Sequence, residues 1–257
     1  MKKKGVTPDL SGKVAIVTGG GRGLGHSIAL GLARAGADVA VCSRKLENCE
    51  AAAAEIRALG RRSLAVACHM GHPDEIDALF GRAVAELGRV DIVVNNSATS
   101  PAARPLTLST PELFDKVYAV NVRGPLQLAS RAAQWMGDHG GGAIVNVISV
   151  GAFKPGPLIG LYCSSKAALH TLTRVMAQEW SSLGVRVNAL APGPVMTDMV
   201  RGIAHDQAFM DGMINSTLMK RIADPEEIVP AVLFLVSDAA SYMTGCTLTV
   251  DGGATAS

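Results

Sequence analysis

The chain has 257 residues, of which 48% are hydrophobic and 18% are charged, and 24 Lys and Arg against 22 Asp and Glu give a formal net charge of +2. A chain of this length and apolar content folds around a sizeable core and is not intrinsically disordered. The near-neutral charge provides no phosphate-binding stripe, so nucleic acid is excluded as the main partner.

The N-terminal half alternates short apolar runs with longer helical patterns. The apolar runs are continuous rather than alternating, which is typical of strands buried on both faces of a sheet. Glycines follow the first two predicted helices and mark where they end. The predicted order is strand 14–17, helix 27–35, strand 38–42, helix 46–59, strand 63–67, helix 74–87 and strand 91–94.

The C-terminal half repeats the pattern in longer units. Thr110 followed by Pro111 resembles a helix cap with proline in the first turn, and predicts one helix that runs to about Met136. The segment 192–220 combines Gly, Pro, Asp and Met without a clean period and is expected to be irregular. The remaining predicted elements are strand 143–148, helix 161–183, strand 185–190, helix 225–235 and strand 247–250.

Strands that alternate with helices predict a parallel sheet covered on both faces. No linker, repeat or low-complexity segment divides the sequence. We therefore expect a single α/β domain over residues 1–257, with a doubly wound Rossmann fold of about seven strands. Residues 1–10 are expected to form a flexible N-terminal extension, and residues 193–220 a candidate substrate lid.

The five cysteines are scattered along the chain, at positions 42, 49, 68, 163 and 246. No pair has the C-x-x-C spacing and the count is odd, so neither a disulfide framework nor a metal site is expected. Reduced thiols favour a cytoplasmic location. The basic start Met1–Lys4 lacks the apolar core of a signal peptide, and no run approaches the roughly 20 apolar residues of a membrane span, so no membrane association is expected.

A glycine-rich turn, Thr18–Gly25, follows the first predicted strand and leads into a helix. Glycines let the backbone turn tightly and approach a pyrophosphate, which then lies at the positive N-terminus of the helix. The bare pattern is a weak signal, but this context favours dinucleotide binding over a turn without a ligand. The residues predicted to contact the cofactor here are Gly19, Gly21, Arg22, Gly23, Leu24 and Gly25.

The end of the second predicted strand indicates which cofactor is bound. A NAD-binding fold places a carboxylate here for the ribose 2′-hydroxyl, but this chain has Ser43-Arg44-Lys45. Ser43, Arg44 and Arg22 offer the hydroxyl and guanidinium groups that suit a 2′-phosphate. NADP is therefore predicted, with NAD as second choice. The alternative is that Arg44 and Lys45 only form a solvated helix start.

Tyr162 and Lys166 are four residues apart in a predicted helix and so point from one face. A free tyrosine has a pKa of about 10, and a neighbouring ammonium favours the phenolate and lowers that pKa. The pair is therefore a candidate general acid and base. Ser149 ends a predicted strand 13 residues earlier, and a loop followed by a helix start can bring both hydroxyls to one substrate oxygen.

These motifs together resemble those of the short-chain dehydrogenase/reductase family, and the resemblance extends from about Lys13 to Gly253. The glycine turn is similar to the family's T-G-x-x-x-G-x-G motif. The other matching segments are Asn95-Asn96-Ser97-Ala98, which resembles N-N-A-G with small residues in the last two positions, Asn121 in Asn-Val-Arg-Gly, Ser149, Tyr162, Lys166, and Pro192-Gly193 with the later Thr197.

The resemblance implies an NAD(P)-dependent oxidoreductase that transfers a hydride between the nicotinamide and a carbonyl or secondary alcohol substrate. Tyr162 would exchange a proton with the substrate oxygen and Ser149 would hold that oxygen. Lys166 would bind the nicotinamide ribose and lower the pKa of Tyr162, while Asn121 would anchor a water relay. The further cofactor-binding residues it implies are His69, Met70, Asn95, Ser97, Tyr162, Lys166, Pro192, Gly193, Val195 and Thr197.

One segment departs from the family pattern. Many relatives carry an Asp near the adenine after the third strand, where this chain has Cys68-His69-Met70. His69 can still donate or accept a hydrogen bond there. The same segment, with Ser43-Arg44-Lys45, resembles a carbonyl-reductase branch that uses NADPH.

Three irregular segments, 99–107, 151–160 and 194–220, are expected to border the substrate. Their low charge and flexible side chains favour an apolar or mid-sized ketone, aldehyde or secondary alcohol. In the resembled family two helices, here 111–136 and 161–183, form a dimer face and the last strand a second one, so a homotetramer is implied. The side chains expected at the substrate are Phe153, Leu158, Ile159, Met196, Met199, Met213 and Met219.

Two other functions were weighed. A catalytically silent NAD(P)-binding scaffold or redox sensor would keep the fold without turnover, but the intact set of Asn121, Ser149, Tyr162 and Lys166 argues against it. A serine hydrolase built on Ser149 lacks the G-x-S-x-G elbow.

Overall fold

A computed structural model of the chain describes residues 8–202 and 206–256. Its centre is a seven-stranded sheet in the order β3-β2-β1-β4-β5-β6-β7, and every neighbouring pair is parallel. The predicted doubly wound α/β fold is confirmed. The strands are β1 (Val14–Thr18), β2 (Asp38–Ser43), β3 (Ser63–Ala67), β4 (Ile92–Asn95), β5 (Gly142–Val147), β6 (Val185–Pro192) and β7 (Thr247–Val250).

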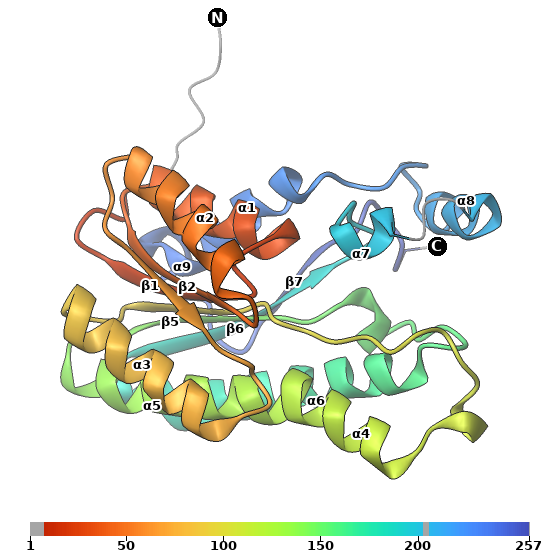
Figure 1. Ribbon diagram of the computed structural model, residues 1–257, viewed down its shortest axis with the longest axis horizontal. Helices are drawn as coiled ribbons and strands as arrows, with labels where there is room; N and C mark the ends of the chain where they lie inside the picture. The colour runs from red at the N-terminus through yellow and green to blue at the C-terminus, as the bar shows by residue number, and fades with distance from the viewer. Residues whose placement is uncertain (1–7, 203–205, 257) are drawn as a thin grey trace, which may run out of the picture.

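Helices cover both faces of this sheet (Figure 1). One face carries α1 (Gly23–Arg34), α2 (Leu46–Ala58) and α9 (Val229–Val236), and the other carries α3 (Pro73–Leu87), α5 (Gly124–Asp138) and α6 (Gly160–Trp180). The strand order turns back between β1 and β4, because β2 and β3 lie on one side of β1 and the later strands on the other. Open sheets of this kind bind ligands at the carboxyl ends of the strands beside that point.

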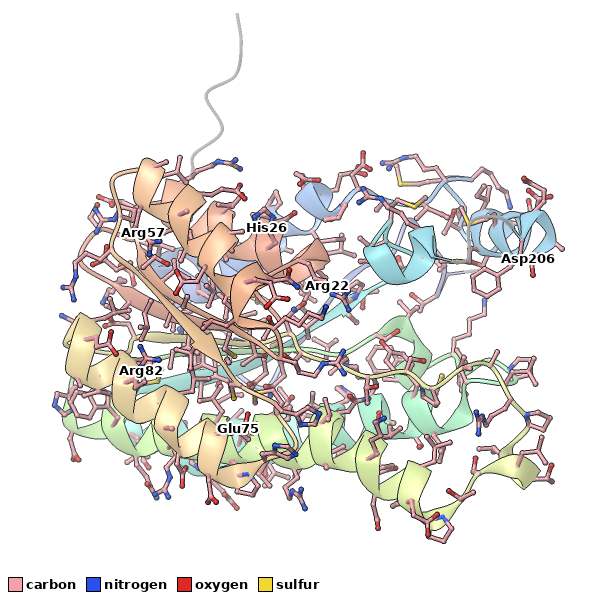
Figure 2. The ribbon with its side chains drawn as sticks, in the orientation of Figure 1. Arg22, His26, Arg57, Glu75, Arg82 and Asp206 are labelled. Atoms are coloured by element: carbon pink, nitrogen blue, oxygen red, sulfur yellow. The ribbon has the colours of Figure 1, made fainter. Side chains whose placement is uncertain are left out.

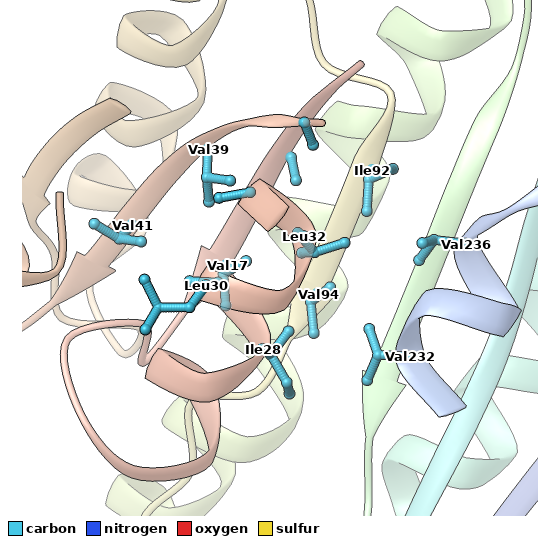
Figure 3. Packing of buried hydrophobic residues seen from close by; sticks show 14 of the residues in the cluster. Val17, Ile28, Leu30, Leu32, Val39, Val41, Ile92, Val94, Val232 and Val236 are labelled. Carbon is cyan, nitrogen blue, oxygen red and sulfur yellow. The ribbon is translucent and has the colours of Figure 1, made fainter. Parts of the chain in front are cut away.

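The continuous apolar runs are explained by two separate cores. Ala15 and Val17 of β1 pack in the cluster that contains Ile28 of α1, shown in Figure 3. Val14 and Ile16 point to the opposite face and pack in the cluster of α3 and α5. Side chains alternate between the two faces of a strand, so a strand with a core on both sides has no polar positions.

The helix predicted from Pro111 to Met136 is wrong in one respect, because it is interrupted. Thr110 does cap its start, since Oγ1 accepts from the Leu113 N–H at 3.3 Å. The chain then forms α4 (Pro111–Tyr118), a π turn (Ala119–Arg123), and α5. Pro125 is the physical reason. It has no N–H for the carbonyl of Asn121, four residues earlier, and its ring would collide with that carbonyl in a regular helix.

The segment predicted as irregular after Pro192 contains two short helices, α7 (Asp198–Arg201) and α8 (Gln207–Asn215). Asp206 stands at the start of α8 (Figure 2) and caps it, because its Oδ1 accepts from the Phe209 N–H at 3.0 Å. The predicted helix 225–235 begins as a 3-10 turn, Pro225–Glu227, before α9. The predicted N-terminal extension, through residue 7, and residues 203–205 of the predicted lid lie outside the described residues.

Candidate active site

A cavity of about 390 Å³ lies along the carboxyl ends of six strands. Residues that directly follow β1 to β6 line it, together with parts of α4, α6 and the segment after β6. It therefore occupies the place where a doubly wound sheet binds its ligand. Seventeen of the residues predicted from sequence as catalytic or cofactor-binding line it: Gly19, Arg22, Gly23, Leu24, Gly25, Ser43, Arg44, His69, Met70, Ser97, Ser149, Tyr162, Lys166, Pro192, Gly193, Val195 and Thr197.

The glycine turn brings the start of α1 against the ends of β1 and β4. Gly19 has φ +68° and Gly23 has φ +54°, a region that glycine adopts without steric cost. Gly25 packs directly on the turn, because a Cβ there would collide with the Gly19 carbonyl oxygen and with the Asn96 amide. No side chain caps the first turn of α1 and no acidic residue lies in it. Its N–H groups are thus available to an anion.

Thr18 fixes the loop that follows β4. Its Oγ1 accepts from the backbone N–H groups of Asn96 and Ser97, at 3.0 and 2.9 Å. The Asn96 side chain donates back to the Thr18 carbonyl at 2.9 Å. Asn96 lines the cavity beside Ser97 and was not among the predicted contacts, although it belongs to the motif that was recognised.

The charge of the cavity wall has one sign. Arg22, Arg44, Lys116 and Lys166 line it, and no Asp or Glu of the residues that the structure describes does so. Arg22 lies at the end of α1 that faces α7 (Figure 2). Ser43 lines the cavity too, and its Oγ donates to the Lys45 carbonyl at 3.0 Å. A wall with cations and free backbone N–H groups fits a ligand that carries several phosphates.

His69 occupies the cavity wall after β3 in one defined tautomer. Its Nδ1 accepts from the Gly71 N–H at 3.1 Å, so in the neutral ring the proton is on Nε2. The ring stacks on His72, with centroids 4.4 Å apart. Burial, and then the positive charges of His72 and Arg44, lower the pKa of His69, which keeps the ring neutral. His69 thus offers the cavity a hydrogen-bond donor where an Asp would offer an acceptor.

Ser149, Tyr162 and Lys166 meet at the cavity wall. Ser149 is the second residue after the end of β5, and its Oγ accepts from the Gly151 N–H at 3.1 Å, so its own O–H can donate to a neighbouring oxygen. The Ser149 hydroxyl lies near enough to the Tyr162 phenol to lower its pKa. Lys166 lies 5.8 Å from the Tyr162 ring centroid, and its Nζ donates to the Val147 carbonyl at 2.7 Å. Two hydroxyls and an ammonium therefore converge on one side of the cavity.

The pKa of Tyr162 differs from the sequence expectation. Burial raises the pKa of this phenol above its usual value, and the hydrogen bond from Ser149 only partly opposes that. Burial also lowers the pKa of Lys166 to about 8, because no carboxylate compensates its charge. The pKa of Tyr162 therefore shifts in the direction opposite to the one expected from the sequence.

Asn121 lies behind the cavity wall rather than on it. Its side chain is fully buried, at 0% exposed, and clamps both backbone polar groups of Thr99. Oδ1 accepts from the Thr99 N–H at 2.8 Å, and Nδ2 donates to the Thr99 carbonyl at 2.9 Å and to Ser165 Oγ at 2.9 Å. Both amide hydrogens are used, so a water relay would have to begin at the Asn121 backbone.

Two other predicted cofactor contacts also lie away from the cavity. Asn95 is 1% exposed, and its Nδ2 donates to the Pro125 carbonyl and to Asn146 Oδ1, at 3.1 and 2.9 Å, so it joins β4 to β5. Gly21 gives room for α2, because a Cβ there would stand 3.0 Å from Asn48 Cβ. The lining residues that were not predicted as cofactor contacts are Cys68, Asn96, Ala98, Thr99, Lys116, Val120, Val147, Ile148, Pro194, Val200 and Met213.

Part of the cavity wall is apolar and comes from the segment after β6. Val200 of α7 and Met213 of α8 line it, so both short helices of the predicted lid reach the site. Met213 was expected to border the substrate, whereas the side chain of Met199 lies outside the described residues. The other expected substrate contacts, Phe153, Leu158, Ile159, Met196 and Met219, do not line the cavity.

Two further sequence expectations can be compared with the described residues. In 8–202 and 206–256, no three His, Cys, Asp or Glu side chains come together as a metal ion would require, and the absence of a metal stays a prediction. None of the helices described is both long and apolar enough to span a bilayer.

Comparison with known proteins identifies clear relatives. Residues 19–255 match a family model described as enoyl-(acyl carrier protein) reductase. The chain is 40% identical over 244 residues to dehydrogenase/reductase SDR family member 4 of Bos taurus, which covers 95% of this chain and 88% of that protein.

Solved structures agree with this relationship. A 7α-hydroxysteroid dehydrogenase complexed with NADH and a 7-oxo bile acid superposes with a TM-score of 0.91 at 36% identity, covering 95% of each chain. A gluconate 5-dehydrogenase from Burkholderia cenocepacia, complexed with NADP and tartrate, has a TM-score of 0.92 at 32% identity and covers 97% of each. The relatives thus include proteins solved with either nicotinamide cofactor.

Proposed function

Because the chain belongs to the short-chain dehydrogenase/reductase family, and is therefore an oxidoreductase of alcohol or carbonyl groups, we propose that it reduces ketones or aldehydes with NADPH, using Tyr162 as proton donor. The observation that carries this proposal is that the Ser149 hydroxyl and the Tyr162 phenol line the cavity together with the buried Lys166. The same groups serve the reverse reaction, in which Tyr162 takes a proton from the alcohol.

The cavity fits a nicotinamide dinucleotide at both of its ends. At one end the open turn of α1 and the nearby arginines suit phosphates, and at the other Lys166 Nζ has two hydrogens left after its bond to Val147. We assign those two hydrogens to the ribose next to the nicotinamide. When bound, the cofactor supplies or accepts the hydride, which is the part of the reaction that no side chain can perform.

The protein's own groups then orient and polarise the substrate. Ser149 can donate to the substrate oxygen, because its Oγ already accepts from the Gly151 N–H. Tyr162 can donate its phenolic proton to the same oxygen as negative charge develops there. Its raised pKa keeps that proton in place until reduction begins. Met213 and Val200 exclude water from this end of the cavity.

The preference for NADPH rests on the groups after β2. Arg22 and Arg44 line the cavity and are exposed, so both can reach a 2′-phosphate without losing an internal partner that the structure describes. His69 Nε2–H adds a donor for an acceptor atom of the adenosine. A charge-assisted pair with phosphate contributes about 1.5–3 kcal/mol, so we expect NADPH to bind at least about tenfold more tightly than NADH.

Fluorescence titration with NADPH and with NADH at one salt concentration tests this preference. Arg44→Ala should weaken NADPH binding by at least about tenfold and change NADH binding by less than about threefold. Lys45→Ala is the matched control, because Lys45 is adjacent and exposed but does not line the cavity. Tighter binding of NADH by the wild type would contradict the preference, and binding of neither cofactor would contradict the proposed reaction.

The substrate end favours an uncharged carbonyl compound of apolar or mid-sized shape. Thr99, Ser149, Pro194, Val200 and Met213 supply no charge there. A carboxylate substrate would lack a cation to pair with at that end, apart from Lys166. A panel of neutral ketones and aldehydes is therefore the first screen, and a preference for sugar acids would contradict this substrate class.

Assembly and organisation complete the proposal. We propose one domain that forms a homotetramer, in which residues 193–220 close over the substrate. Large apolar side chains are exposed on the two helices expected at the first face, Phe114 (43%) and Val175 (39%), and support that contact. Light scattering of the purified protein would test it, and a monomeric mass would contradict it. The cytoplasmic location inferred from the cysteines stays a prediction.

A silent scaffold or redox sensor receives no support from the relatives, since those described above are named as dehydrogenases or reductases. The four side chains expected for catalysis are all present in this chain.

A further inference from the structure

Ser165 is a fully buried polar side chain that the proposed reaction does not use. It lies between Tyr162 and Lys166 in the first turns of α6, is 0% exposed, and does not line the cavity. Its Oγ donates to the Tyr162 carbonyl at 2.7 Å and accepts from Asn121 Nδ2 at 2.9 Å. One hydroxyl thus joins the π turn to the helix that carries the reacting phenol.

The same contact continues to the cavity wall. Asn121 holds both the N–H and the carbonyl of Thr99, and Thr99 lines the cavity. Hydrogen bonds therefore run from Thr99 through Asn121 and Ser165 to the Tyr162 backbone. They connect the loop after β4 with α6 across the π turn.

The π turn needs this connection. Pro125 removes the hydrogen bond that would hold Asn121 in a regular helix, so the position of the Asn121 side chain depends on its own partners. Without the Ser165 hydroxyl, one amide hydrogen of Asn121 is buried with no acceptor. A buried unpaired donor is costly, so the amide would turn away and loosen its hold on Thr99.

We propose that Ser165 is a positioning residue, which holds Asn121, and through it Thr99, in register with Tyr162 at the reacting end of the cavity. This inference rests on the proposed function, because the group being positioned is the proposed proton donor. The competing explanation is that Ser165 only stabilises the helix locally by donating to a backbone carbonyl three residues earlier.

Ser164 separates these two explanations. Its Oγ donates to the Leu161 carbonyl at 3.0 Å, which is the same local bond, but it is exposed and has no hydrogen bond to the π turn in the described residues. Ser164→Ala is therefore the matched control for Ser165→Ala. Asn121→Ala and the double variant Asn121→Ala/Ser165→Ala complete a double-mutant cycle.

The first readout is kcat and KM with NADPH and the best carbonyl substrate of the panel. Ser165→Ala should lower kcat by at least about tenfold, since a small displacement of reacting groups is enough for that, and change KM by less than about threefold. The kcat of Ser164→Ala should stay within about twofold of the wild-type kcat. The kcat of the double variant should lie within about twofold of the kcat of Asn121→Ala. A Ser165→Ala kcat within twofold of wild type, or independent losses that multiply in the double variant, would overturn the proposal.

The second readout needs no substrate. Phenolate absorbance after rapid pH jumps, with Tyr162→Phe spectra subtracted, follows Tyr162 alone among the three tyrosines. In Ser165→Ala the Tyr162 pKa should rise, because Ser165 no longer holds the Tyr162 carbonyl and the phenol, free to move away from Ser149, loses its lowering effect. An unchanged Tyr162 pKa in Ser165→Ala would refute the positioning role, whether or not the wild type turns over a substrate. Absence of turnover by the wild type would contradict the proposed function, and not the positioning role. If Ser165→Ala does not fold, Ser165→Cys, which keeps a weak donor and acceptor, is measured by the same criteria.

Discussion

Lys166 is the largest fully buried side chain of the described protein and carries a charge at neutral pH, so its replacement should separate stability from function. It is 2% exposed, and burial lowers its pKa from 10.5 to about 8. At about 1.4 kcal/mol for each pH unit, this lowering means that the charged form costs the folded state about 3–4 kcal/mol. Lys166→Met keeps the size of the side chain and removes that cost.

The change at neutral pH is partly offset. The variant loses the hydrogen bond from Nζ to the Val147 carbonyl, and an unpaired buried carbonyl costs about 1–3 kcal/mol. At pH 7 the variant should therefore be as stable as wild type, or more stable by up to about 3 kcal/mol. It should nevertheless lack turnover, because it has no donor for the ribose and no ammonium beside Tyr162.

The pH dependence isolates the charge from the hydrogen bond. A lysine whose folded pKa is lowered destabilises the protein fully while both states are charged, below about pH 8, and not at all once both are neutral, above about pH 10.5. Urea unfolding of both proteins across this range should show wild type gaining about 3–4 kcal/mol relative to Lys166→Met. Stability curves that stay parallel would refute the reasoning, because they would mean that Lys166 titrates normally in the fold.

Three further predictions concern single side chains. Tyr162→Phe should lower kcat by about 10²–10⁴-fold and leave NADPH affinity within about threefold. Steady-state kinetics and a fluorescence titration measure the two quantities, and an unchanged kcat would contradict the prediction. Gly25→Ala should abolish NADPH binding and lower the melting temperature, because the added Cβ collides with the Gly19 carbonyl. Gly81→Ala in α3, where a Cβ meets nothing within 4 Å, should do neither. Equal melting temperatures of the two variants would contradict the close contact at Gly25. Pro125→Ala restores an N–H that can bond the Asn121 carbonyl and close a regular helix, so kcat should fall while the melting temperature holds or rises; unchanged kcat would show that the π turn does not need the proline.

The sequence predicted the fold because its strands carry a signal that is local. Runs such as Val14–Val17 are apolar at every position, and two cores, one on each face, explain that directly. The glycine turn was recognisable for the same reason, since a strand, a turn and a helix follow one another in the chain. Local pattern was sufficient for these elements.

Some of the departures involve interactions between distant segments, and others involve local signals that were not used. The break at Asn121 depends on Pro125 and on Thr99 22 residues earlier. Pro125 was a signal that could have been used, because proline inside a helix removes a hydrogen bond four residues back. The raised pKa of Tyr162 depends on how deeply the folded chain buries it, and no spacing of residues contains that information.

The Asp206 cap was a second available signal. Asp followed by a helix-forming stretch predicts a helix start, and the missed α8 begins there. Glycines, methionines and a proline earlier in the same segment masked it. By contrast, the place of Asn95 between β4 and β5 depends on Asn146, which lies 51 residues away.

The most direct test of the proposed reaction follows one hydrogen atom. The purified protein would be given NADPH deuterated at C4 of the nicotinamide, as each stereoisomer separately, with the neutral carbonyl panel, and the alcohol products analysed by mass spectrometry. We expect one stereoisomer to deliver its deuterium to the carbinol carbon in the wild type, and Tyr162→Phe to form at least about a hundredfold less labelled alcohol. Labelled alcohol formed at the wild-type rate by Tyr162→Phe would contradict the role of Tyr162, and no labelled alcohol from any carbonyl compound would contradict the proposed reaction.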